Sequence, residues 1–336
     1  MRSRRLSQRI AAFTAAAGLA LSGCGTGTTP TPPPATAEAG PTRTVIDAGG
    51  NSIQVPTHPE RIVTLSEPTL DGVLALGVTP IGTTAGRGQS GVPNYLAGLA
   101  VDLPILGGVA QPNFEAIGAA KPDLILVDGT SVNNNPPVIA ALGKIAPVVY
   151  TGYAGGDWRA NFRHTADALN LAEAGEQVIT DYDDHVAQAR QQLAGYPDST
   201  FSIVRWQGNS ASVILKELLP GQALSDLGLR RPAGQDRVGR GHSEPVSLEN
   251  LKSIDADYLF FGTLGGSSVG NPDAGGGTGI ESARQALNEA SSVPGFTELD
   301  VYKSGHIILV DGSAWTSTGG PLLMNRLIDD VVSALG

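Results

Sequence analysis

Two glutamates at matching positions are the first residues in the sequence whose spacing suggests chemistry. The segment NFEAIGAAKPDLI (residues 113–125) recurs as SLENLKSIDADYL (residues 247–259), so that Glu115 corresponds to Glu249. Asn and Ser at the two starts are typical helix N-caps, which predicts that both glutamates lie in the first turn of a helix. A carboxylate there gains about 0.3–1 kcal/mol from the helix dipole, and this alone is one explanation. Neither occupies the capping-box position, however, and matched placement in two diverged halves also needs a reason.

Catalytic motifs elsewhere are weak. The stretch GSSVG (266–270) matches the GxSxG pattern of serine hydrolases, but it does not run straight from a strand into a helix, as a nucleophile elbow must. The run GGGTG (275–279) lacks the spacing of a phosphate-binding loop and is interpreted as a flexible loop. The scattered histidines form no HxxxH pair and there is no cysteine cluster, so we expect no metal site and no enzyme.

The elements that would position these groups alternate between strand and helix. Apolar runs such as RIVTL (61–65) and FSIVRW (201–206) are separated by helical patterns, which predicts α/β lobes with largely parallel sheets. We expect an N-terminal lobe over 43–156 and a C-terminal lobe over 195–336. The repeated glutamate segment falls once in each lobe, so the repeat is interpreted as structural duplication.

A single long helix is expected to join the lobes over residues 157–194. Apolar residues there recur mostly at three- and four-residue steps. Such a helix would be about 57 Å long, too long to lie inside one small lobe. Asn170 and Gly175 are the residues that could interrupt it.

The N-terminus has the pattern of an export signal. Residues 1–24 join a basic start to an apolar run too short to span a bilayer, and they end in Leu-Ser-Gly-Cys at Cys24, the only cysteine. This resembles a bacterial lipobox, in which the cysteine is lipidated, rather than a buried or leftover thiol. Arg4 and Arg5 leave open whether export is general or twin-arginine. The Thr- and Pro-rich residues 25–42 are expected to be an unfolded tether.

The body of the chain is large and acidic. It has nearly 300 residues, beyond the size at which single cores usually split into two. Removing the four arginines of the basic start takes the formal charge from −10 to −14. This charge argues against nucleic acid as a partner.

The order of these features resembles a known family. Residues VIDAGG (45–50), PERIV (59–63), FEAI (114–117), KPDLI (121–125) and SLE (247–249) occur in the order and spacing of the substrate-binding lipoproteins of ABC importers for ferric siderophores, haem and cobalamin. The resemblance implies two Rossmann-like lobes and a ligand bound between them. It also implies that Glu115 and Glu249 dock on arginines of the permease. The protein is then expected to be a monomer that is anchored outside the cytoplasm through the lipid on Cys24.

In such a cleft an anionic iron complex needs cations and flat aromatic surfaces, and Arg offers bidentate donors. The candidates chosen by position are Arg87, Tyr153, Trp158, Arg205, Trp206, Arg240, His242 and Trp315. Trp158 is equally explained as a core residue on its helix face. Arg205 has an alternative role as a loop contact and His242 as a solvated loop residue.

The functional expectation is a binding protein that captures a ferric siderophore and presents it to a permease, without a cofactor. The alternatives are a haem- or cobalamin-binding protein of the same fold, or a cell-envelope sensor or adhesion lipoprotein. The sequence leaves open the class of ligand, the permease and the extent of lobe closure.

Overall fold

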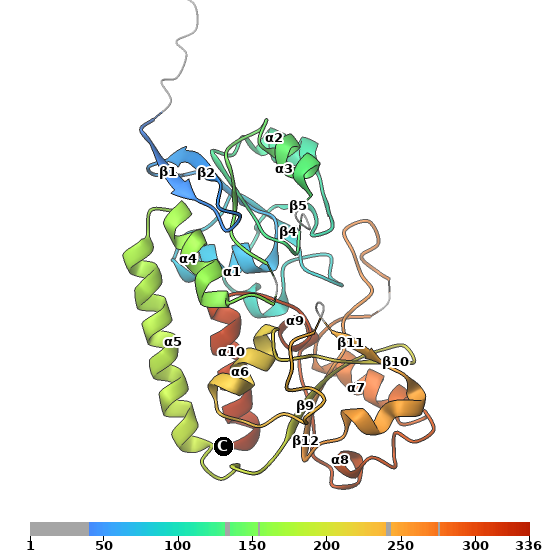
Figure 1. Cartoon of the computed structure of the whole chain (residues 1–336). Helices are drawn as coiled ribbons and strands as arrows, with labels where there is room; N and C mark the ends of the chain where they lie inside the picture. Colours follow the sequence, from blue (N-terminus) through green and yellow to red (C-terminus); the bar gives the residue numbers. More distant parts are fainter. Residues whose placement is uncertain (1–39, 132–134, 154, 240–242, 275) are drawn as a thin grey trace, which may run out of the picture. The chain divides into compact units, whose positions relative to one another are not determined.

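The structure is a computed structural model that describes residues 40–131, 135–153, 155–239, 243–274 and 276–336. Gly40 to Gly336 form one compact unit that contains two sheets and a two-stranded hairpin. Figure 1 shows the two sheets, with α4 and α5 running along one side of them. The expected signal peptide, Cys24 and most of the tether lie outside the described residues. Among the described helices, none has both the length and the apolar character needed to cross a membrane.

The N-terminal lobe is built on a six-stranded sheet with the order β6-β5-β4-β3-β7-β8. Its strands are β3 (Ile62–Thr64), β4 (Gly82–Ala85), β5 (Ile105–Gly108), β6 (Gln111–Pro112), β7 (Leu124–Val127) and β8 (Val148–Tyr150). Neighbours run parallel except β6, which pairs antiparallel with β5. The other elements are the hairpin of β1 (Thr42–Ile46) and β2 (Ser52–Pro56), α1 (Glu67–Ala75), the 3₁₀ helix η1 (Asn94–Leu96), α2 (Phe114–Ala120) and α3 (Pro136–Leu142).

The C-terminal lobe has a five-stranded sheet with the order β11-β10-β9-β12-β13. Its strands are β9 (Phe201–Gln207), β10 (Ser210–Val213), β11 (Glu244–Val246), β12 (Tyr258–Gly262) and β13 (Ile307–Leu309). Strands β9, β12 and β13 are parallel, whereas β10 and β11 are antiparallel. The helices are α6 (Leu219–Asp226), the 3₁₀ helix η2 (Leu248–Ile254), α7 (Ile280–Ala290), α8 (Asp300–Lys303), α9 (Gly312–Trp315) and α10 (Pro321–Leu335). The expected α/β lobes with largely parallel sheets are therefore confirmed.

The expected single connecting helix is broken at Asn170, one of the two residues named as possible interruptions. Residues 157–194 form two helices, α4 (Trp158–Ala168) and α5 (Ala172–Gln192). Between them Asn170 has a φ of 61°, a left-handed conformation that ends a helix. Gly175 does not interrupt α5. A Cβ there would lie 2.6 Å from the Cβ of Ala166, so this glycine lets α5 pack closely against α4.

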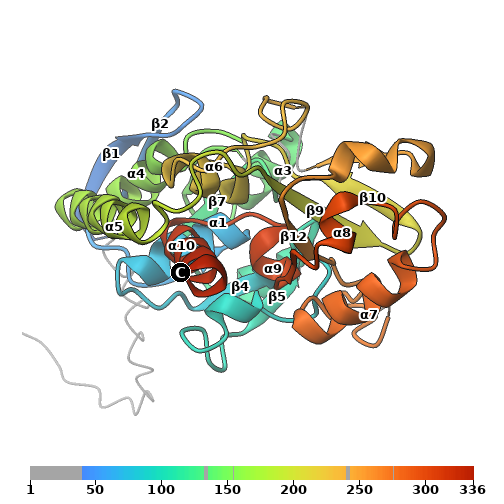
Figure 2. The same ribbon diagram turned by 90° about the horizontal axis from the view of Figure 1, so that it is seen from below.

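The two connecting helices differ in their main partners. Helix α4 contacts α1 and β1, whereas α5 packs along α10. In Figure 2, α10 lies beside both α5 and α6. At α5 the apolar face is buried by residues such as Ile179 and Tyr182, which belong to the large core of the C-terminal lobe. The break at Asn170 thus lets the connecting segment pack on the N-terminal lobe through α4 and on the C-terminal lobe through α5.

A buried carboxylate joins the lobes at the contact of α1 with α10. Asp71 of α1 is fully buried and accepts hydrogen bonds from the backbone N–H groups of Leu322 and Leu323, each at 2.9 Å. The hydroxyl of Tyr95 donates to the same carboxylate at 3.0 Å. Burial raises the pKa of Asp71 to about 6 even though these bonds favour its charged form. The N-terminus of the last helix is thus capped by a side chain of the other lobe.

Candidate functional site

The site begins at the carboxyl ends of the parallel strands in the N-terminal lobe. In open α/β sheets these ends meet at one edge, where ligands bind. Ser66 and Glu67 follow β3, Arg87 follows β4, and Asp128 follows β7. Glu67 and Asp128 are 3% and 2% exposed, so two carboxylates are buried at this edge below the loop that carries Arg87.

Arg87 is held through its backbone. Its N–H donates to Glu67 Oε1 at 2.8 Å, and its guanidinium reaches the carbonyl of Thr130 at 3.5 Å. Thr130 is fixed in turn, because its N–H and its hydroxyl donate to Asp128 Oδ1 at 3.0 and 2.5 Å. The guanidinium forms no ion pair with a carboxylate of the described chain, and Arg87 lines two adjoining pockets.

Arg205 lies at the corresponding edge of the C-terminal lobe, near the end of β9. Its guanidinium donates to Ser243 Oγ at 2.6 Å and likewise has no carboxylate partner within the described residues. Burial lowers the pKa of Arg205, and the charge of Arg87 lowers it further. Two partly desolvated cations from opposite lobes therefore repel one another. A bound anion would relieve that repulsion.

The pocket beside Arg87 is formed by both lobes. It has a volume of about 420 Å³ and an adjoining pocket has about 740 Å³. The N-terminal lobe contributes residues 86–89 and 108–111 to the first pocket, and the C-terminal lobe contributes Leu264 and residues 267–269. The chain therefore has a two-lobed cleft with a cation in its wall.

The two lobes touch through glycines where the pocket ends. A Cβ on Gly88 would lie 2.2 Å from the carbonyl oxygen of Gly265, so only glycine allows this approach. The hydroxyl of Ser267 donates to the carbonyl of Gly88 at 3.2 Å. The Gly-rich loop of the C-terminal lobe is thereby attached to the loop that carries Arg87.

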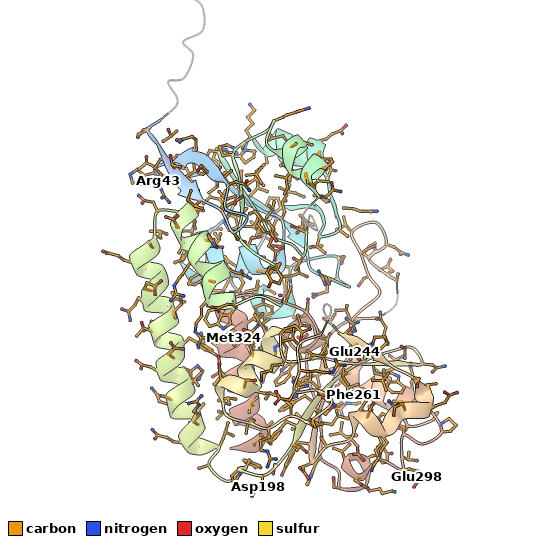
Figure 3. All side chains as sticks on the ribbon, in the orientation of Figure 1. Arg43, Asp198, Glu244, Phe261, Glu298 and Met324 are labelled. Atoms are coloured by element: carbon orange, nitrogen blue, oxygen red, sulfur yellow. The ribbon has the colours of Figure 1, made fainter. Side chains whose placement is uncertain are left out.

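The prediction that three tryptophans line the cleft is wrong. Trp158, Trp206 and Trp315 are only 2%, 0% and 0% exposed. Trp158 packs edge-on against Tyr182, Trp206 packs with Phe261 and Phe296, and Trp315 stacks on Phe260 with ring centroids 4.2 Å apart. Figure 3 shows Phe261 inside the C-terminal lobe. These rings stabilise the core and leave no flat surface for a ligand.

Tyr153 is the aromatic candidate that remains accessible. It is 58% exposed, and its Cβ lies close to Gly129, a residue of the larger pocket. Arg240 and His242 lie outside the described residues.

The paired glutamates are exposed, as their role would require, but their helices differ. Glu115 lies in the first turn of α2, whose N-cap Asn113 accepts from the N–H groups of Glu115 and Ala116. Glu249 lies in the 3₁₀ helix η2, which bends at Asn250 and has no side-chain bond from its N-cap Ser247. The expected first-turn position holds in both copies, whereas the α-helical form holds only in the first.

The family is decided by comparison with known proteins. Residues 62–314 match the model of the periplasmic binding protein family. This chain is a periplasmic binding protein. It is 31% identical over 297 residues to the probable siderophore-binding lipoprotein YfiY of Bacillus subtilis, with 86% of each chain covered. It is 24% identical to the Fe(3+)-citrate-binding protein YfmC of the same organism, covering 84% of this chain and 83% of that one.

A solved structure supports the same assignment. SirA of Staphylococcus aureus, determined in complex with staphyloferrin B, superposes with a TM-score of 0.72 at 25% identity. The alignment covers 88% of this chain and 98% of SirA. As a periplasmic binding protein the chain is a solute-binding protein and not an enzyme, and its ligand is a cargo rather than a cofactor.

The hydrolase-like motif has a local structural role. Its central serine, Ser268, accepts from the N–H of Asn271 at 3.2 Å in a tight turn, and no helix follows. Residues 267–269, which include this serine, line the pocket beside Arg87 in this periplasmic binding protein.

Within the described residues no group of three or more His, Cys, Asp or Glu side chains could hold a metal ion.

Sequence analysis missed the buried carboxylates Glu67 and Asp128 and the loop residues Thr130 and Ser267. A signal was present for the first three, since each closely follows a predicted strand. Ser267 carried no signal, because its contact with Gly88 joins positions 179 residues apart.

Proposed function

We propose that this periplasmic binding protein captures a ferric siderophore in the interlobe cleft and delivers it to an ABC permease. The observation that carries the proposal is the pair Arg87 and Arg205, which come from opposite lobes, lack carboxylate partners in the described chain and repel one another. An anionic iron complex offers carboxylate or catecholate oxygens that a guanidinium binds through two parallel hydrogen bonds. The siderophore-binding relatives support the same class of ligand.

A ligand titration tests this proposal. The protein from residue 43 onward is titrated calorimetrically with ferric citrate, ferric staphyloferrin B, ferric petrobactin, haemin and cobalamin, with each iron-free chelator as control. We expect saturable binding of a ferric siderophore at micromolar concentration or below, about −8 kcal/mol. Tight binding of haemin or cobalamin alone would reassign the ligand. Binding of none would reject the proposal.

Permease docking through Glu115 and Glu249 is part of the same proposal. Both side chains are exposed, one on each lobe, and both start a helical segment. Exposed carboxylates on two lobes can engage two arginines of a symmetric partner at once, which favours one orientation of delivery.

Anchoring through a lipidated Cys24 completes the proposal, with residues 25–42 as the tether and a single chain as the functional unit. It is supported by the lipobox-like LSGC sequence and by the lipoprotein relative. Replacing Cys24 with Ala should release the protein from the membrane fraction. Metabolic labelling with a fatty acid would show whether the cysteine carries the lipid.

A further inference from the structure

Two buried carboxylates below the cleft do not touch the pocket. Glu67 and Asp128 follow the adjacent strands β3 and β7, yet neither lines the pockets beside Arg87. Glu67 Oε1 accepts the backbone N–H of Arg87, whereas Oε2 is buried without a hydrogen-bond donor in the described chain. A buried carboxylate that is only half satisfied is costly, so this glutamate needs an explanation beyond its place at the start of α1.

The second carboxylate acts on the side chain of the same arginine. Asp128 Oδ1 accepts both donors of Thr130, and the carbonyl of Thr130 accepts from the guanidinium of Arg87. One carboxylate thus fixes the backbone of Arg87, and the other fixes the group that orients its guanidinium. The three bonds to these ionised carboxylates are charge-assisted and therefore stronger than neutral ones.

We propose that Glu67 and Asp128 are positioning residues that hold Arg87 in the orientation that binds the iron complex. This inference rests on the proposed function, because it assigns Arg87 to the ligand. Preorganisation of this kind increases affinity by reducing the conformational freedom that is lost on binding.

The C-terminal lobe provides a matched control. Glu217 is also buried, at 7% exposure, its Oε1 accepts the N–H of Gly239, and its Oε2 has no donor in the described chain. It therefore presents the same kind of half-satisfied carboxylate without any bond to Arg87. A general effect of removing a buried carboxylate should appear equally in Glu217→Ala.

A double-mutant cycle with Arg87 tests the proposal, with the tightest-binding of ferric citrate, ferric staphyloferrin B and ferric petrobactin as probe. We expect Glu67→Ala to weaken binding about tenfold and Glu67→Gln, which keeps an acceptor oxygen, to weaken it less than about threefold. In the background of Arg87→Ala, Glu67→Ala should weaken binding no further, whereas Glu217→Ala should have the same effect in both backgrounds. Additive effects of Glu67→Ala and Arg87→Ala would overturn the proposal.

A pH profile provides a readout that does not require the alanine variants to fold. Burial, and next the charge of Glu67, raise the pKa of Asp128 to about 6, although bonds from Thr130 oppose the shift. Among the described residues, the ionisable groups close to it are Glu67 at the start of α1, Arg87, which bonds to the carbonyl of Thr130, and Tyr150 at the end of β8, whose hydroxyl lies beside Gly129. Protonation of Asp128 removes the charge-assisted bonds that hold Thr130, so the positioning role predicts that affinity falls as the pH falls through about 6.

Asp128→Asn removes this titration and should show a flatter profile than the unaltered protein with the same probe. Identical profiles would overturn the role of Asp128. If the unaltered protein binds none of the three complexes, the proposed function fails and this inference fails with it. If the unaltered protein binds a complex but the effects of Glu67→Ala and Arg87→Ala on affinity add, only the positioning role is rejected.

Discussion

The two copies of the repeated segment keep the same aspartate bond but build different helices. In the N-terminal lobe Asp123 accepts from the N–H groups of Glu60 and Arg61, at the residues that lead into β3. In the C-terminal lobe Asp257 accepts from the N–H and the hydroxyl of Thr200, which leads into β9. Each aspartate therefore joins the start of its own strand to the start of the neighbouring parallel strand.

The helices before these aspartates have diverged. The end of α2 is fixed by Arg61, which donates to the carbonyls of Ala120 and Lys121. The kinked 3₁₀ helix η2 is held near its end by Gln235, whose side-chain amide donates to the carbonyl of Ser253 at 3.1 Å. In both copies a side chain from elsewhere in the lobe thus satisfies carbonyls that lack donors within the helix. The comparison teaches that the two copies share the strand alignment and the exposed glutamate, whereas the helical segments between them differ.

The largest expected effect concerns the exposed glutamates. The double change Glu115→Ala and Glu249→Ala should reduce uptake of the iron complex by more than about tenfold in cells while the affinity for ligand stays unchanged. Each single change should give a smaller loss if both copies dock. Uptake that survives the double change would show that these glutamates only stabilise helix starts.

The arginines provide the second contrast between the lobes. Arg87→Gln and Arg205→Gln should each weaken ligand binding about ten- to a hundredfold, since a charged hydrogen bond is worth about 1.5–3 kcal/mol. Arg284→Gln is the control, because this exposed arginine of α7 forms an ion pair with Glu281 and lines neither pocket beside Arg87. Isothermal titration at two salt concentrations would measure both losses. An unchanged affinity in one variant would assign the ligand to the other lobe.

Stability distinguishes the two aspartates. Asp123→Ala should lower the free energy of unfolding by about 1–2 kcal/mol, because it removes the acceptor of two backbone N–H groups. Asp257→Ala should cost about 0.5–1 kcal/mol, since Asp257 is exposed and water can replace its bonds. Urea denaturation of both variants gives the comparison. Equal losses of unfolding free energy in the two variants would contradict the explanation that the greater exposure of Asp257 makes its hydrogen bonds contribute less.

The smallest effect is a pH dependence in the C-terminal copy. Hydrogen bonds from the backbone and the side chain of Thr200 lower the pKa of Asp257 below its usual value. Its stabilising contribution is therefore present above that usual value, near 4, and is lost as the pH falls through the lowered pKa. The stability difference between the unaltered protein and Asp257→Asn should shrink as denaturation is repeated from pH 6 down to pH 3. A constant difference would show that these bonds do not depend on the charge.

The sequence predicted the architecture because hydrophobic periodicity reports burial directly. Strands such as β7 and β9 and the division into lobes followed from it. Asn170 was recognised as a possible break, and its left-handed backbone explains why the break falls there and not at Gly175. The 3₁₀ form of η2 was not predictable, since an N-cap residue type followed by a first-turn glutamate is compatible with either kind of helix.

The site was only partly predictable, because a position at a strand end does not reveal which way a side chain points. Arg205 and Trp206 are neighbours on β9, and alternation along a strand places them on opposite faces. If Arg205 faces the cleft, Trp206 must face the core, where it packs against Phe296. This argument was available from the sequence, whereas the contact of Gly88 with Gly265 required the fold.

The cap that Asp71 provides for α10 gives the protein an internal reporter of lobe separation. The first N–H groups of a helix usually exchange rapidly with solvent hydrogen, because they have no partner within the helix. Those of Leu322 and Leu323 are bonded to a buried side chain of the opposite lobe. Their deuterium uptake therefore measures how often α1 and α10 part, and a change on adding ligand would reveal lobe motion without any attached label.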